Sequence, residues 1–418
     1  MYDKSALSKE KEWDVFNVHD PSIFKDFDGY YYIFSTDTRA EGKSKPGIQI
    51  RRSPDLINWE WWGRAFAGIP QKAGEWSGAS DLWAPEVFWM KGYYYLYYSA
   101  STFGSQRSAI GVARSKSIAG SWDDLGIVVK TSAESVPNAI DPNIVTDRKG
   151  RPWLVYGSFF GGIFITRLNP DTGKLLNPEQ QTLLARRADE VDNAVEGPYV
   201  IYNPQFDKFY LFVSYGSLSS NYNIRVGRSD EITGPYRDFR GHRLTDVETN
   251  PYHVGNKLVA GYKFTGGETW KAPGHNSVLK DGDDYFLVHH ARGGKNPRWA
   301  YLHLRKLLWS QDGWPLVSPE RYSGEVKQSI PRKVLPGKWE FIKFKPADNN
   351  IANPITVNCK ISENSLRKLT DNVFQIKLGT EFQGRIIPCW DWENWQPALA
   401  FTGKNKKGLS LWGKRIRK

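Results

Sequence analysis

The chain has 418 residues, more than one ordinary domain needs, which predicts one large domain and a smaller one. Its 18 Trp, 21 Tyr and 21 Phe, with 38 Gly and 24 Pro, favour an all-β architecture rich in turns, and we expect no convincing helices. No apolar run is long enough to span a bilayer, so we expect no membrane partner.

The formal charge of +12 is concentrated at the C-terminal end. Residues 331–418 hold 17 Lys and Arg against 7 Asp and Glu, which leaves 40 basic and 38 acidic residues in the rest of the chain. A nearly neutral large region is a poor electrostatic match to a phosphate backbone. We therefore expect no nucleic-acid partner.

The two cysteines and the first residues leave the compartment open. Cys359 and Cys389 both lie in the C-terminal segment, where one disulfide and two free thiols fit equally well. The first 15 residues contain no apolar segment typical of a signal peptide. We expect an extracellular, monomeric protein whose signal has been trimmed, with a cytoplasmic location as the alternative.

A five-fold internal repeat organises the first 320 residues. Each copy starts with a short polar-to-apolar segment, continues through a turn containing Gly or Asp, and enters an aromatic strand about ten residues later. The five starts lie about 55 to 80 residues apart, which is enough for a four-stranded sheet in each copy. The starting segments are His19–Ile23, Trp83–Val87, Ile140–Ile144, Val195–Tyr199 and Gly274–Val278.

This pattern predicts an all-β fold, with a five-bladed β-propeller over residues 1–325 and a small C-terminal β-barrel or sandwich over 326–418. The first strand of each blade lines the axis of a propeller. Asp20, Asp141 and Glu196 come from three different repeats, and we expect them to meet in one central funnel.

Three converging carboxyl groups favour acid–base chemistry over a structural role. An isolated Asp-Pro pair is usually a turn, but here the acidic residues recur at equivalent positions. Clustered, buried carboxylates raise one another's pKa, so that one can stay protonated while another is ionised. Glycoside hydrolysis requires that pair of states.

The ordered set of motifs resembles glycoside hydrolase family 43, and within it the endo-α-1,5-L-arabinanases most closely. The resemblance covers the five repeats and, more weakly, the C-terminal segment. The segments that carry it are His19-Asp20-Pro21, Leu82–Glu86, Tyr97–Ser105, Ala139–Asn143, Val195–Tyr199, Gly274–Ser277 and Asp312–Arg321.

The resemblance implies inverting endo-hydrolysis of α-1,5-arabinofuranosidic linkages in arabinan, a polysaccharide of pectin side chains. Asp20 would be the general base, Glu196 the general acid, and Asp141 the residue that orients the acid and tunes its pKa. An exo-acting arabinofuranosidase or β-xylosidase on the same scaffold, and a non-catalytic glycan-binding propeller, are the alternatives.

The same resemblance implies a metal and several substrate contacts. His275 would help to hold one calcium ion on the propeller axis, although calcium prefers oxygen ligands. The expected substrate-binding residues are the aromatic Trp83 and Phe103 and the polar Asn143, Ser158 and Arg292.

Overall fold

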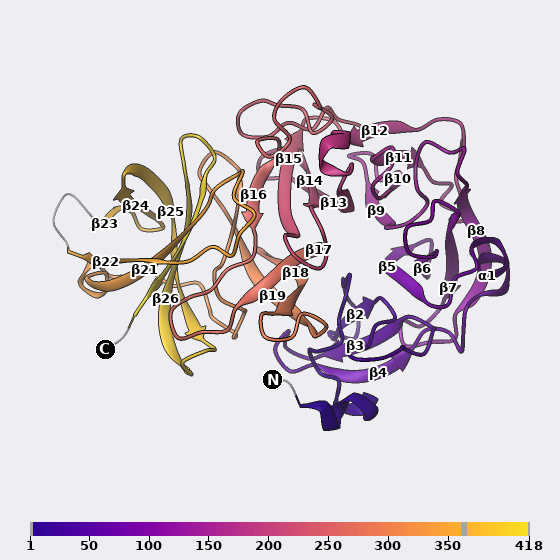
Figure 1. Ribbon diagram of the computed structural model, residues 1–418, viewed down its shortest axis with the longest axis horizontal. Helices are drawn as coiled ribbons and strands as arrows, with labels where there is room; N and C mark the ends of the chain where they lie inside the picture. The colour runs from indigo at the N-terminus through magenta and orange to yellow at the C-terminus, as the bar shows by residue number, and fades with distance from the viewer. Residues whose placement is uncertain (1–2, 361–365, 417–418) are drawn as a thin grey trace.

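The computed structural model describes residues 3–360 and 366–416. Five four-stranded antiparallel sheets are arranged around a common axis, which confirms the predicted propeller (Figure 1). Sequence-adjacent strands pair in every blade, so each blade is a meander. The strands are β1 (Ser22–Lys25), β2 (Tyr31–Ser35), β3 (Gln49–Ser53) and β4 (Glu60–Arg64) in blade 1; β5 (Leu82–Met90), β6 (Tyr93–Ala100), β7 (Ser108–Ser115) and β8 (Asp123–Thr131) in blade 2; β9 (Asn143–Thr146), β10 (Pro152–Tyr156), β11 (Ile163–Arg167) and β12 (Thr182–Ala185) in blade 3; β13 (Val195–Asn203), β14 (Lys208–Tyr215), β15 (Asn223–Ser229) and β16 (Asn256–Val259) in blade 4; and β17 (Trp270–Asp281), β18 (Asp284–Gly293), β19 (Ala300–Trp309) and β20 (Pro315–Val317) in blade 5.

The helical content is small, and one element was not expected. The α-helix α1 (Gln71–Ser77) follows Pro70 and ends at Gly78, whose left-handed φ of 70° closes the last turn. Proline before a segment and glycine after it mark helix ends, but seven residues are too few to show a periodic pattern. The short 3₁₀ helices are η1 (Lys4–Ser8), η2 (Glu10–Glu12), η3 (Asp189–Val191) and η4 (Arg332–Val334). Within the described ranges, no helix combines the length and apolar character needed to cross a bilayer.

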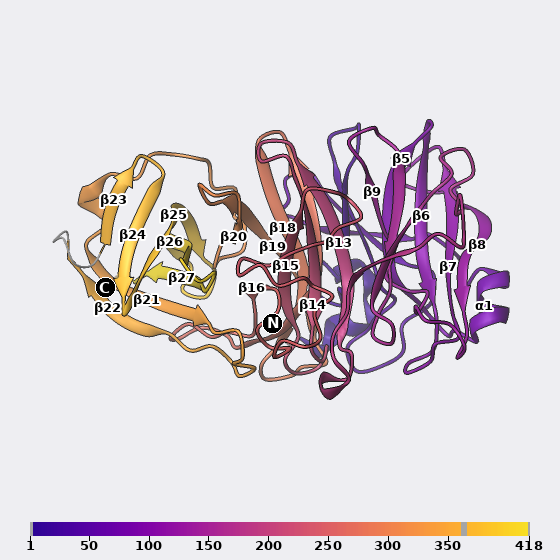
Figure 2. The same cartoon turned by 90° about the horizontal axis from the view of Figure 1, so that it is seen from above.

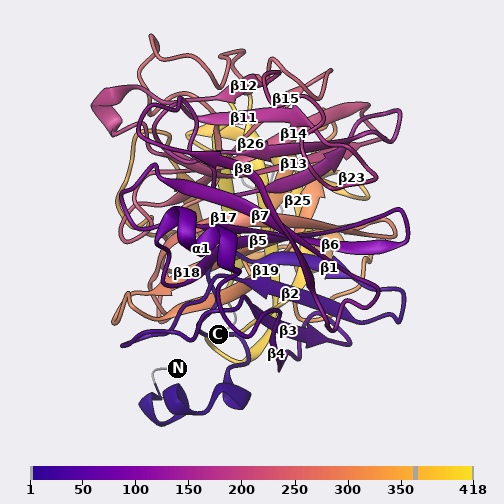
Figure 3. The same cartoon turned by 90° about the vertical axis from the view of Figure 1, so that its right-hand side faces the viewer.

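The C-terminal domain is one curled, seven-stranded antiparallel sheet that forms a half-barrel, in the order β22-β21-β27-β26-β25-β24-β23. It lies at one end of the long axis, beside blades 4 and 5 (Figure 2), and therefore behind the propeller in the end-on view of Figure 3. Cys359 and Cys389 are buried, free thiols in this sheet. Its strands are β21 (Gly337–Phe344), β22 (Ile355–Cys359), β23 (Leu366–Thr370), β24 (Val373–Leu378), β25 (Thr380–Asp391), β26 (Gln396–Asn405) and β27 (Ser410–Arg415).

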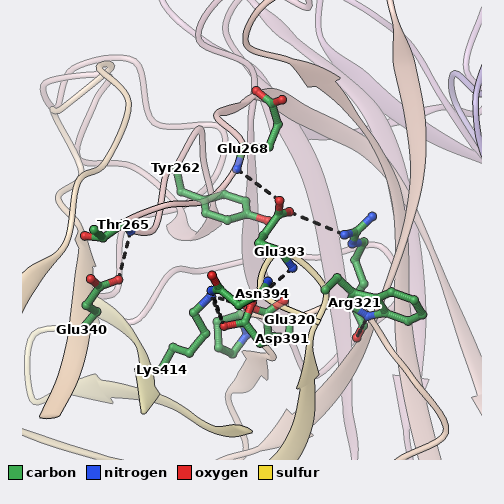
Figure 4. A network of polar contacts seen from close by, with 12 residues as sticks. Tyr262, Thr265, Glu268, Glu320, Arg321, Glu340, Asp391, Glu393, Asn394 and Lys414 are labelled. Carbon is green, nitrogen blue, oxygen red and sulfur yellow. Dashed lines mark hydrogen bonds and ion pairs between the residues drawn. The ribbon is translucent and has the colours of Figure 1, made fainter. Parts of the chain in front are cut away.

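The two domains share an apolar core and a buried ionic network. Trp412 of β27 packs edge-on against Tyr262, which lies between blades 4 and 5, with ring centroids 5.2 Å apart. Beside this contact, Lys414 Nζ lies 3.1 Å from both Glu320 Oε1 and Asp391 Oδ2 (Figure 4). These three side chains are no more than 7% exposed. Buried charges of this kind need their partners, because an unpaired buried charge is strongly destabilising.

Replacing Lys414 with Met should therefore lower the free energy of unfolding by about 3–5 kcal/mol, because Glu320 and Asp391 would be left buried without a cation. Chemical denaturation of the full chain measures the change. The matched control is Lys4→Met, which removes a pair between Lys4 and Glu41 in which the lysine side chain is 71% exposed. That change should cost less than about 1 kcal/mol. Equal effects of the two substitutions would contradict the structural role given to Lys414.

Candidate active site

Each blade places one residue with a left-handed backbone at the same point of the repeat. The φ angles at these points are 52° at Asp20, 39° at Ala84, 61° at Asp141, 56° at Gly197 and 47° at His275. For a residue with a Cβ atom this conformation costs about 1–2 kcal/mol and persists only where surrounding contacts impose it. The recurring motif is therefore a backbone bend, repeated five times at the propeller axis.

The contacts that hold these bends run from blade to blade. In every blade, the backbone N–H of the left-handed residue donates a hydrogen bond to a side chain of the preceding blade. Blade 1 donates back to blade 5, so the ring is closed. The bonds are Asp20 to His290 Nδ1 (3.3 Å), Ala84 to Thr36 Oγ1 (2.8 Å), Asp141 to Ser99 Oγ (3.0 Å), Gly197 to Asp141 Oδ2 (3.0 Å) and His275 to Ser214 Oγ (2.7 Å).

The Asp20 carboxylate accepts several hydrogen bonds at the axis. Thr36 Oγ1 donates to Oδ2 at 2.6 Å, while Oδ1 lies 2.8 Å from His19 Nδ1 and 3.1 Å from His275 Nδ1. Burial alone raises the pKa of Asp20, but the two histidines outweigh it and hold the pKa well below its usual value. Asp20 is therefore ionised at neutral pH.

The pKa values of the other two carboxyl groups are shifted in the opposite direction. Burial raises the pKa of Asp141 to about 7, and the neighbouring charges of Glu196 and Asp20 add to the effect. Burial also raises the pKa of Glu196, although Ser158 Oγ donates to its Oε2 at 2.7 Å. The axis thus holds one ionised carboxylate and, close to it, carboxyl groups that retain a proton more readily.

His275 supplies positive charge between these groups. Its Nδ1 lies 3.1 Å from Asp20 Oδ1 and 3.9 Å from Asp141 Oδ2. Burial lowers the pKa of an imidazole, but here the carboxylates reverse the effect and raise the pKa of His275 to about 9. The fifth blade therefore contributes a cation where blades 1 and 3 contribute carboxylates.

Arg292 acts on Asp20 through His19. A guanidinium can only donate, so the contact of 2.8 Å between Arg292 Nη2 and His19 Nε2 makes Nε2 the acceptor. The proton of a neutral His19 then lies on Nδ1, which faces Asp20. Arg292 was expected to bind substrate, and the structure shows its contact with His19. His19 was not predicted as a site residue, although it adjoins Asp20 in the motif. Thr36 and Tyr222, whose side chains bond Asp20 and Glu196, were not predicted either. Thr36 occupies the repeat position of Ser99, Ser214 and His290 at the end of the second strand, which is a signal that could have identified it.

The predicted substrate-binding residues take up different positions. Trp83 is half-buried beside Ala84 and donates from Nε1 to Asp81 Oδ1 at 2.8 Å. Phe103 is 87% exposed in the loop between β6 and β7. Ser158 bonds Glu196, as described above. Asn143 is 1% exposed, and both ends of its amide are already hydrogen-bonded within the protein, so the structure places it below the site and not at its surface.

Comparison with known proteins identifies the propeller and the C-terminal domain separately. Residues 15–315 match the model of glycosyl hydrolases family 43, and residues 319–413 match a C-terminal lipocalin-like domain of that family. An extracellular endo-α-(1→5)-L-arabinanase of Thermotoga petrophila is 31% identical, over 97% of this chain and 94% of the relative. An extracellular exo-α-(1→5)-L-arabinofuranosidase of Cellvibrio japonicus is 35% identical, over 75% of this chain and 90% of the relative.

The solved structures agree with this result. The crystal structure of an endo-1,5-α-L-arabinanase from Thermotoga petrophila superimposes with a TM-score of 0.85 at 30% identity. The match covers 97% of this chain and 99% of that one, so both domains are shared.

The ring of backbone bonds predicts the effect of removing one acceptor. Ser214→Ala leaves the buried N–H of His275 without a partner and should lower the free energy of unfolding by about 1–3 kcal/mol. Chemical denaturation measures it, with Ser8→Ala as the control because Ser8 is exposed and bonds only locally. If both variants unfold at the wild-type denaturant concentration, the ring does not hold the bend at His275.

Proposed function

Because the chain belongs to glycosyl hydrolase family 43, we propose that it cleaves α-1,5-linked arabinan with Asp20 as the general base and Glu196 as the general acid. The observation that carries the proposal is the contrast in protonation at the axis. Asp20, held by two histidines and Thr36, has a depressed pKa, whereas the half-buried Glu196, bonded by Ser158, has a raised one. A base and an acid with separated pKa values are what hydrolysis of a glycosidic bond needs.

Each residue has a defined part in the proposed reaction. Asp20 takes a proton from the attacking water, and Glu196 gives its proton to the leaving oxygen. Asp141 accepts a hydrogen bond from the N–H of Gly197, the residue after the acid, and so orients Glu196. The electrostatic interaction between Asp141 and Glu196 opposes simultaneous ionisation of both. Water attacks the face opposite the leaving group, which inverts the anomeric configuration.

The two-domain architecture supports endo action on an extracellular polysaccharide. The Thermotoga petrophila relative, an extracellular endo-arabinanase, matches along both domains. The Cellvibrio japonicus relative, an exo-acting arabinofuranosidase, matches over only 75% of this chain. The exo alternative is supported by the higher identity to the Cellvibrio japonicus relative, 35% against 31%. The size of the products released from arabinan therefore has to decide between endo and exo action. The convergence of the three carboxyl groups weighs against a non-catalytic propeller.

A divalent cation fits the charges of the site, and we propose calcium beside His275. Asp20 and Asp141 lie 3.1 Å and 3.9 Å from His275 Nδ1, and the neighbouring carboxyl groups stabilise a proton on that imidazole. A histidine ligand must be neutral, so bound calcium would take the place of this proton. Next to His275, both side-chain atoms of Asn276 are buried without a hydrogen-bond partner, so an amide oxygen is available. With few protein ligands, water would complete a calcium shell. Bound calcium would supply positive charge near the carboxylates.

The first experiment incubates the protein with linear arabinan, branched arabinan, arabinoxylan and an aryl arabinofuranoside, and resolves the products by size. Short arabino-oligosaccharides from linear arabinan are expected, with β-anomers in the earliest NMR spectra. Glu196→Gln should reduce turnover of arabinan at least about 100-fold, because general-acid catalysis contributes about 10²–10⁴-fold. The matched control is Glu190→Gln. Glu190 is an exposed carboxylate of η3, in the connection from β12 to β13 that leads into Glu196.

Release of arabinose alone would move the assignment to an exo enzyme. Absence of any product would favour the glycan-binding propeller, and equal activity of Glu196→Gln and wild type would refute the acid assignment.

The calcium proposal is tested without turnover. Calcium added to chelator-treated protein should raise the melting temperature, since a ligand that binds only the folded state stabilises it. His275→Ala should abolish the shift. Calorimetric titration of the same two proteins with calcium alone gives the affinity. A wild-type protein that shows neither heat of binding nor a shift up to millimolar calcium would exclude a calcium site.

A further inference from the structure

A second ring of polar side chains lies one layer below the catalytic residues. It consists of the residues two positions after each left-handed residue, namely Ser22, Glu86, Asn143, Tyr199 and Ser277. All but the half-buried Tyr199 are at most 3% exposed. Buried polar groups are costly unless they are hydrogen-bonded, so five of them at one level of the axis require an explanation.

The hydrogen bonds of this second ring again connect neighbouring blades. Ser277 Oγ of blade 5 donates to Pro21 O of blade 1, and a backbone hydrogen bond links Val278 of blade 5 to the Tyr199 hydroxyl of blade 4. The remaining connections are Ser22 Oγ to Glu86 Oε2 (2.7 Å), Asn143 Nδ2 to Glu86 Oε1 (2.9 Å) and Val200 N to Asn143 Oδ1 (2.9 Å). Every adjacent pair of blades is therefore tied at this level.

Glu86 links two neighbouring blades within this second ring. It is the one carboxyl group among the five positions, and each of its oxygens accepts from a different neighbouring blade. Both carboxyl oxygens act as acceptors in these contacts, so Glu86 holds a donor on each side even though burial raises its pKa to about 7. Blade 2 places Ala84 in the catalytic layer, where it contributes no functional group, and places its carboxyl group two residues further down.

The two partners of Glu86 are close in sequence to two catalytic residues. Ser22 follows Asp20 after one proline, and Asn143 follows Asp141 after one proline. Proline fixes its own φ and restricts the residue before it, so little flexibility separates each partner from its carboxylate. Displacement of reacting groups by about 1 Å can cost about 100-fold in rate.

We propose that Glu86 is a positioning residue, which sets the placement of Asp20 relative to Asp141 by binding Ser22 and Asn143 from opposite sides. The proposal rests on the proposed function for its kinetic consequence. It assigns Asn143 to the same positioning network and not to direct contact with sugar.

The experiment compares Glu86→Ala, Glu86→Gln, Ser22→Ala and Asn143→Ala on linear arabinan. In Glu86→Ala, kcat should fall about 100-fold, while KM stays within about threefold because no sugar-binding group is removed. Glu86→Gln keeps one acceptor oxygen and should recover about tenfold of that loss. In the double variant Glu86→Ala/Asn143→Ala, the loss should be smaller than the product of the single losses, because the two changes break one shared bond.

The matched control is Glu320→Gln, another buried carboxyl group, which pairs with Lys414 far from the axis. It should lower the melting temperature without changing kcat at 25 °C. The same pattern in Glu86→Ala, a lower melting temperature with wild-type kcat, would overturn the positioning role. If Glu86→Ala does not fold, the milder Ser22→Ala and Asn143→Ala variants decide by the same kinetic criterion.

A crystal structure of Glu86→Ala separates this proposal from the proposed function. Should the wild-type protein cleave none of the substrates, the function fails, but a shift of the Asp20 or Asp141 carboxylate in the variant still supports the positioning role. Carboxylates that superimpose on those of the wild-type crystal structure would overturn it.

Discussion

The grouping of three carboxyl groups with several imidazoles at the propeller axis is the constraint on which the rest of this structure depends. Asp20, Asp141 and Glu196 share a small, largely desolvated space with His275, and like charges in such a space cannot all ionise. The asymmetry arises from contacts, because His19 and His275 stabilise the charge on Asp20 while burial dominates at Glu196. One fold with approximate five-fold repetition thus obtains distinct acid and base roles from differences among its blades.

The closed rings of inter-blade bonds account for how such a cluster is tolerated. A left-handed residue at each axis position is strained when it carries a Cβ, and the bond from its N–H to the preceding blade offsets that cost. The acceptors of these bonds include polar residues near the ends of the second strands, such as Ser99 and Ser214. Removing a blade contact therefore affects backbone geometry at the axis as well as blade packing.

Much of the fold could be predicted because each repeat is marked by local sequence signals. Turn residues, aromatic strands and a recurring segment predicted five blades and a shared axial site for Asp20, Asp141 and Glu196. The expected equivalence of position holds for Asp20 and Asp141, whereas in blade 4 the left-handed residue is Gly197 and Glu196 precedes it. The hydrogen-bond partners of side chains were harder to predict, because a sequence motif does not indicate which neighbouring blade a polar group faces. Asn143 was expected to meet sugar, yet its amide is taken up by Glu86 and Val200, which only the three-dimensional arrangement reveals.

The C-terminal domain is connected to the catalytic axis through one strand. Glu393, in the hairpin between β25 and β26, accepts hydrogen bonds from the N–H of Glu268 and from Trp270 Nε1, and it pairs with Arg321. Trp270 begins β17, the strand that carries His275 five residues later. The half-barrel therefore contacts the first residue of β17, the strand that carries His275. The network of Glu320, Lys414 and Asp391, by contrast, serves the stability of the domain pair.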